Sequence, residues 1–197
     1  YYVQVLGLPP ELGGAAIFIA VMFDAVTDPI AGYISDAWHS RWGRRHPFMY
    51  ASAVPVAIAF YFTFVPPAGL SEMQLFAWLL GTSIATRAAM ALFVVPHYAL
   101  GAELSEERSE RTAVVSMRYA FFSAGNLMVY ASLDYFFANG PDGSSGQLIS
   151  GNYPRFALTG ALVMVVSILL CALGPHHRIP HLAKPATIER PSRPILG

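Results

Sequence analysis

Charged side chains are scarce in this chain of 197 residues. Asp, Glu, Lys and Arg together make up 12% of it, whereas about 25% of an average soluble domain is charged. Hydrophobic residues make up 55% and aromatic residues 13%. This composition excludes an ordinary soluble domain and indicates an integral membrane protein.

Cysteine is nearly absent as well, because Cys171 is the only one in the sequence. A disulfide within the chain is therefore excluded. The formal net charge is zero, which provides no bulk basic field for nucleic acid. The sequence contains no metal-ligand cluster, phosphate-binding loop or nucleophile elbow, so nothing in it indicates an enzyme or a bound cofactor.

Long apolar runs are what the sequence has in abundance. Each is long enough to cross a hydrocarbon core of about 30 Å, which needs roughly 20 helical residues. The runs cover approximately residues 12–34, 46–65, 72–100, 112–138 and 153–173. The chain opens with YYVQVLG rather than with Met, and this stretch is expected to be the tail of a helix already under way. We therefore expect a fragment of a longer protein, with six helices of which the first is truncated.

The basic residues predict how these helices lie in the membrane. Lys and Arg gather after the second, fourth and sixth helices, whereas the loops at residues 66–69 and 139–152 have none. Positive loops stay in the cytoplasm, so even-numbered helices are expected to end on the cytoplasmic side of a cell (inner) membrane. The polar, proline-rich residues 176–197 predict a cytoplasmic linker after a transmembrane domain of residues 1–175.

Two carboxylates, Asp24 and Asp28, lie within the first complete apolar run. Each costs about 2.5 to 3.5 kcal/mol near the centre of a bilayer, more than the neighbouring hydrophobes offset. A spacing of four residues places both on one helix face, with Cβ atoms about 6 Å apart. Such a pair indicates an ion pathway, where the two acids can share one cation or one proton. A structural buried pair is the alternative.

Two arginines also lie within apolar runs, Arg87 and Arg118, and both need partners inside a bundle. For Arg87, a structural partnership with an acid of the preceding runs or with backbone carbonyls competes with a substrate contact. His97 follows Pro96, where the helix loses a hydrogen bond. Its imidazole either caps the freed carbonyls or shuttles a proton.

A glycine and an acid at the end of the same run precede an arginine cluster. This pattern resembles the loop between the second and third helices of the major facilitator superfamily. In that fold, the resemblance implies, the glycine lets helices approach closely, and the acid and arginines hold an inner gate closed. A solvated positive loop is the alternative interpretation. The residues concerned are Gly32, Asp36, Arg41, Gly43, Arg44 and Arg45.

Two longer stretches resemble one family within that superfamily, the glycoside-pentoside-hexuronide:cation symporters. The first joins DAVTDP at residues 24–29 to SRWGR at residues 40–44. The second joins VPHYALGAELS at residues 95–105 to ERT at residues 110–112 and to Arg118. The resemblance covers the chain to about residue 182. It implies the amino-terminal six-helix bundle of a twelve-helix all-α membrane protein, with a carboxy-terminal six-helix half as its partner.

The family's site residues carry over to five positions. Asp24 and Asp28 match the acids that bind the coupling cation, and Thr27 stands where an asparagine of that site is found. Arg118 matches an arginine of the sugar site, and Tyr98 an aromatic residue against which a sugar ring can stack. No metal or organic cofactor is implied besides the coupling ion.

Three departures leave the coupling ion open between H⁺ and Na⁺. Val94 stands where melibiose permease, a member of the family, has an acid that bonds the sugar. Ala91 stands where a threonine helps to hold sodium, and Val21 replaces an arginine.

The sequence as a whole predicts a secondary transporter in the lipid bilayer. We expect cation-coupled symport of a sugar or glycoside by alternating access, with the sites near the midplane between two halves. Two alternatives remain: a facilitator of the same fold that moves a non-sugar or lipid-like solute, and a non-transporting membrane sensor.

Overall fold

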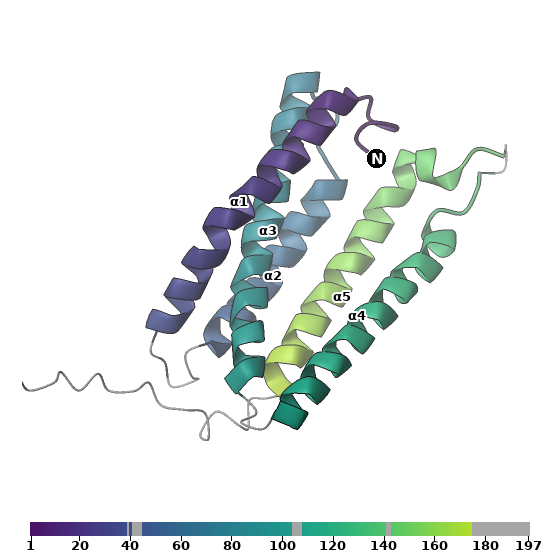
Figure 1. Cartoon of the computed structure of the whole chain (residues 1–197). Helices are drawn as coiled ribbons and strands as arrows, with labels where there is room; N and C mark the ends of the chain where they lie inside the picture. The colour runs from purple at the N-terminus through teal and green to yellow at the C-terminus, as the bar shows by residue number, and fades with distance from the viewer. Residues whose placement is uncertain (39, 41–44, 104–107, 141–142, 175–197) are drawn as a thin grey trace, which may run out of the picture.

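The structure, a computed structural model, describes residues 1–38, 40, 45–103, 108–140 and 143–174. Long helices dominate these residues, and no strand occurs among them (Figure 1). The helices are α1 (Pro10–Ala37), α2 (His46–Phe64), α3 (Glu72–Glu103), α4 (Arg108–Phe136) and α5 (Tyr153–Leu173), with two 3-10 turns, η1 (Gly146–Leu148) and η2 (Ser150–Asn152). The all-α fold class is confirmed, and each expected apolar run coincides with one helix to within four residues at either end. The expected linker at residues 176–197 lies outside the described residues.

The start of the chain, which the sequence predicts to be the tail of a helix, is a short turn. The expected helix tail is a hydrogen-bonded turn, in which the Val5 N–H donates to the Tyr1 carbonyl at 2.8 Å. Gly7 follows with a φ of +76°, in the left-handed region. Pro9 precedes Pro10, the first residue of α1. Together the left-handed glycine and the two prolines separate this turn from the helix that follows.

Small side chains let the first three helices and α5 approach one another. α3 packs against both α1 and α2, and α2 packs against α5. Helices in a bilayer associate through close van der Waals packing, because lipid is as apolar as the side chains it replaces. The alanines buried in this part of the bundle are Ala16, Ala20, Ala31, Ala53, Ala59, Ala89, Ala91, Ala157, Ala161 and Ala172.

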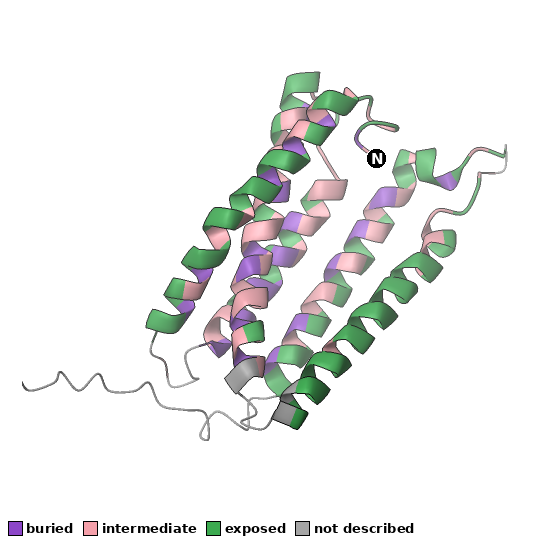
Figure 2. Ribbon diagram, in the orientation of Figure 1, coloured by how far each residue is buried: buried purple, intermediate pink, exposed green. Residues whose placement is uncertain are grey.

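α4 stands apart from this arrangement. Among the described residues, the helices long and apolar enough to cross a membrane are α1, α2, most of α3, and η2 together with α5. The prediction of an apolar span at residues 112–138 is thus borne out as a helix but is wrong in hydropathy, because α4 carries Arg118, Asn126 and Asp134. Exposed residues cover nearly its whole length (Figure 2). A helix with such polar groups is typical of the wall of a pathway.

Gly160 offers a test of the packing between α2 and α5. A Cβ at this position would lie 2.7 Å from Cε1 of Phe60, so a larger side chain must displace the ring. We expect Gly160→Val to destabilise the purified protein by about 1 to 3 kcal/mol, the usual cost of overpacking, measured as a lower melting temperature in detergent. Gly81→Val in α3 is the matched control, because a Cβ there meets nothing within 4 Å. Equal losses in the two variants would contradict this account of the contact.

Candidate functional site: a carboxylate pair and an arginine platform

The two acids of α1 have different surroundings. The half-buried Asp24 accepts a hydrogen bond from Arg87 of α3, with 2.5 Å between Oδ2 and Nη1. Asp28 is exposed and forms no hydrogen bond or ion pair with any residue that the structure describes. Of the two interpretations of Arg87, the structure shows the partnership with an acid. The two carboxylates share a helix, but among the described residues only Asp24 has a cationic partner.

Two contacts fix how α1 lies along α3. The first is the pair of Asp24 with Arg87. The second lies eight residues further along both helices, at Gly32 on α1 and Val95 on α3. There a Cβ on Gly32 would lie 3.6 Å from Cγ1 of Val95. This is an ordinary van der Waals distance, so an alanine would fit where close approach was expected to require glycine. The helices advance together by about 12 Å between the contacts.

Asp28 lies midway between these contacts on α1, and Ala91 lies midway on α3. The side chain of Ala91 is buried, with 5% of its surface exposed. The group level with Asp28 on the neighbouring helix is therefore a methyl, which offers no oxygen to a cation. Val94, one turn further along α3, offers none either.

Oxygen atoms are nevertheless present on α1 itself. The Thr27 hydroxyl donates to the Phe23 carbonyl at 3.2 Å, which leaves lone pairs on its oxygen free to accept. Pro29 lies inside the helix and has no N–H, so the Ala25 carbonyl loses its usual helical donor. The turn around Asp28 thus offers further oxygen atoms. They are fewer than the six or more oxygen ligands that a hard cation prefers.

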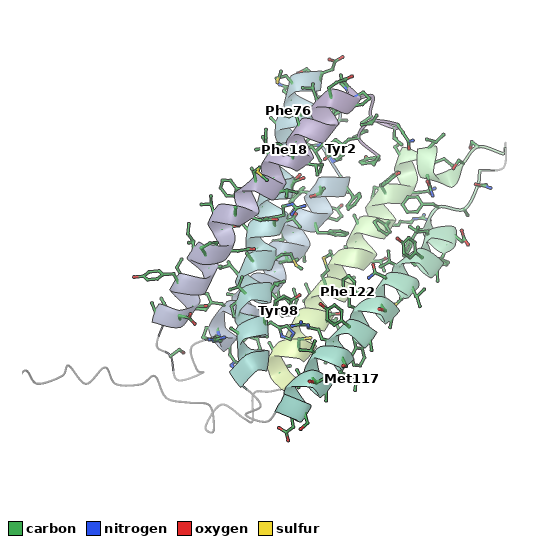
Figure 3. The ribbon with its side chains drawn as sticks, in the orientation of Figure 1. Tyr2, Phe18, Phe76, Tyr98, Met117 and Phe122 are labelled. Atoms are coloured by element: carbon green, nitrogen blue, oxygen red, sulfur yellow. The ribbon has the colours of Figure 1, made fainter. Side chains whose placement is uncertain are left out.

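Arg118 and Tyr98, predicted from different helices, lie together in the structure. The guanidinium carbon of Arg118 on α4 lies 4.4 Å from the centre of the Tyr98 ring on α3, and 5.6 Å from that of Tyr119. This is a cation–π arrangement, which holds the flat guanidinium against the ring. Figure 3 labels Tyr98 on α3, with Met117 and Phe122 on α4 marking the neighbouring helix. We call Arg118 and Tyr98 the arginine platform.

The arginine platform and the carboxylate pair lie at different depths. Tyr98 follows Ala91, the residue level with Asp28, by seven positions on α3. At 1.5 Å per residue this separates the two levels by about 10 Å. The Arg118 guanidinium donates no hydrogen bond to the described residues, so its donors are available to a solute. A solute at the platform and a cation at Asp28 would thus use different ligands.

Two of the residues expected at an inner gate form an ion pair. Arg45, which is buried, donates to Asp36 with 3.2 Å between Nη2 and Oδ1. This bond joins the end of α1 to the start of α2, and Trp38 packs edge-on against Phe48 beside it, with ring centres 5.8 Å apart. Arg41, Gly43 and Arg44 lie outside the described residues.

Of the two roles predicted for His97, the structure does not show the capping of a carbonyl among the described residues. Its ring stacks on Phe93, with centres 5.2 Å apart and planes 14° apart. Within the part of the chain that the structure describes, it donates no hydrogen bond to a carbonyl. Pro96 does not predict this stacking. The spacing of four residues between Phe93 and His97 does, because such side chains are neighbours on a helix.

Comparison with known proteins identifies the family of the chain. The sequence matches the family described as MFS/sugar transport protein over residues 1–196. It is 30% identical over 173 residues to an uncharacterized symporter of Synechocystis, which covers 85% of this chain and 30% of that protein.

Two further relatives carry more specific names. The putative glycoside/cation symporter YagG of Escherichia coli is 29% identical over 66% of this chain and 28% of its own length. The sodium-dependent lysophosphatidylcholine symporter 1 of mouse is 33% identical over 60% of this chain and 23% of its own. The chain thus spans less than a third of each of these three relatives. It belongs to the MFS/sugar transport family of the major facilitator superfamily.

Proposed function

We propose that the full-length protein is a secondary active transporter, which couples the movement of H⁺ or Na⁺ to symport of a sugar or glycoside by alternating access. The observation that carries the proposal is the unpaired Asp28 carboxylate about 10 Å from the level of the arginine platform. A mobile cation at Asp28 cancels a charge that is costly at membrane depth. Its binding therefore changes the free energy of each conformational state, which is the basis of coupling.

The arginine platform supports a sugar as the solute. The guanidinium carries five N–H donors in a fixed fork, which suits neighbouring hydroxyls or an acid that grips them. The Tyr98 ring is 52% exposed, so part of its surface remains open to stack against a sugar face. The name of YagG, a putative glycoside/cation symporter, agrees with this solute class.

A lipid-like solute is the second candidate. The mouse relative is named for lysophosphatidylcholine, and α4 exposes a run of large apolar side chains beside the platform. These include Phe121, Phe122, Leu127 and Met128, each at least 65% exposed. In a whole transporter we expect the carboxy-terminal six-helix half to cover this face and complete the pathway. Uptake of radiolabelled glycosides and of a lysophospholipid, each into vesicles with an imposed cation gradient, separates the two candidates.

We expect Asp28→Asn to abolish cation-driven accumulation of solute in the full-length protein while leaving it in the membrane. Asp24→Asn should act less severely, because Asp24 already has a cationic partner. Accumulation against a gradient in membrane vesicles measures both. Asp134→Asn is the control, because this acid lies exposed on α4 away from the pair. Wild-type accumulation in both acid variants of α1 would show that the cation-site assignment is wrong.

The ligands around Asp28 also favour H⁺ over Na⁺. A proton needs a single carboxylate oxygen, whereas the level of Asp28 on α3 supplies only the buried methyl of Ala91. We therefore expect uptake at fixed pH to continue when Na⁺ is replaced by choline. Strict dependence on Na⁺ in that assay would contradict the prediction.

Arg118→Lys tests the arginine platform. Lysine keeps the charge but loses both the planar face against Tyr98 and the fork of donors. We expect it to weaken solute binding to the purified full-length protein by about 1.5 to 3 kcal/mol, the range for a charged hydrogen bond, with little effect on expression. Arg155→Lys, at an exposed position in the first turn of α5, is the matched control. Unchanged affinity in Arg118→Lys would leave the residue with a structural role only.

A further inference from the structure

Three ionised groups lie within two helical turns of α1 and the facing side of α3. Asp24 and Asp28 contribute two negative charges, and Arg87 contributes one positive charge. The formal charge of the group is therefore −1. One monovalent cation, and not two, brings it to zero.

Arg87 holds its charge permanently, because a guanidinium is not deprotonated in proteins. Its Nη1 lies 2.5 Å from Oδ2 of Asp24, and the Arg87 side chain is 38% exposed against 31% for Asp24. The pair is thus partly withdrawn from solvent, where the attraction between opposite charges is stronger than in bulk water. A mobile cation that competed for Asp24 would have to displace a charge tethered to the neighbouring helix.

We propose that Arg87 is a fixed cation of the ion site: it occupies Asp24 in place of a mobile ion and restricts the site to one coupling cation, held at Asp28. This inference rests on the proposed function. It adds the number of mobile cations that the site holds and names Arg87 as the residue that sets this number. A purely structural Arg87 would hold α1 against α3 without changing how many cations the site binds.

The charge count leads to a distinct expectation for each variant. Arg87→Gln leaves two free acids and a charge of −2, so the site should take up added cation more strongly. Asp24→Asn leaves Arg87 without its acid, and the guanidinium can then compete for Asp28. The double variant Asp24→Asn/Arg87→Gln has only Asp28 and returns to −1. Ion binding should therefore recover in the double variant, although it differs more from the wild type in sequence.

Ion binding can be measured without knowing the solute. Melting temperatures of the purified full-length protein and its variants are recorded in NaCl and in choline chloride at equal ionic strength. We expect little Na⁺-dependent rise in the wild type, whose site favours H⁺. Arg87→Gln should gain one, because its two free carboxylates offer the oxygens that Na⁺ prefers, and the double variant should fall back to the wild-type value. Arg155→Gln, on α5, is the control for removal of a positive charge elsewhere. A Na⁺ response in Arg87→Gln no larger than that of the wild type would overturn the proposal.

Transport provides the second measurement. In cation-driven uptake we expect Asp24→Asn to lose about tenfold or more, and the double variant to recover to within about threefold of the wild type, as expected for residues that are energetically coupled. A double variant as inactive as Asp24→Asn would mean that Asp24 itself binds the mobile cation, and the inference fails. If the wild type drives no uptake of glycosides or lysophospholipid while the melting results hold, the proposed function fails and the fixed cation stands.

Discussion

The ion pair between Asp24 and Arg87 is the contact on which the rest of the site depends. It joins residues 63 positions apart and links α1 to α3 in a part of the bundle where charge is expensive. Together with the contact between Gly32 and Val95, it fixes the register of the two helices. That register places Asp28 opposite a methyl rather than a charge. The open carboxylate is thus a consequence of where its neighbour is held.

Much of the fold follows from the sequence because hydrophobic length is a local property. Each helix coincides with a predicted run to within four residues, although α4 is less apolar than expected. The prolines inside α1, α2 and α3 do not interrupt these helices, because neighbouring groups can satisfy the carbonyl that a proline leaves without a donor. The aromatic and aliphatic residues at the start of the chain suit the predicted helix tail, and the turn that they form ends at Gly7 in the left-handed region, before Pro9.

The sequence predicted which residues belong to the candidate site, but not which of them contact one another. The cost of two acids in an apolar run marks Asp24 and Asp28 from sequence alone. Which of them is neutralised depends on Arg87, whose position opposite Asp24 is set by the packing of α1 on α3. The resemblance to a family likewise indicated Arg118 and Tyr98 separately, whereas their cation–π contact requires α3 and α4 to meet at one level. Pairings between helices are set by tertiary structure, which a sequence pattern does not encode locally.

The helix α4 is packed less tightly than the other helices, which affects the two groups of site residues differently. Extensive contacts join α1 to α3, α3 to α2 and α2 to α5, whereas α4 meets α3 and α5 at few points and exposes most of its length (Figure 2). The carboxylate pair belongs to the tightly packed group, but the arginine platform spans α3 and α4. A shift of α4 would therefore alter the platform while leaving Asp24 and Arg87 in place. In the proposed transporter, such an arrangement would let the solute site change shape while the ion site keeps its charge, and alternating access requires that kind of difference between sites.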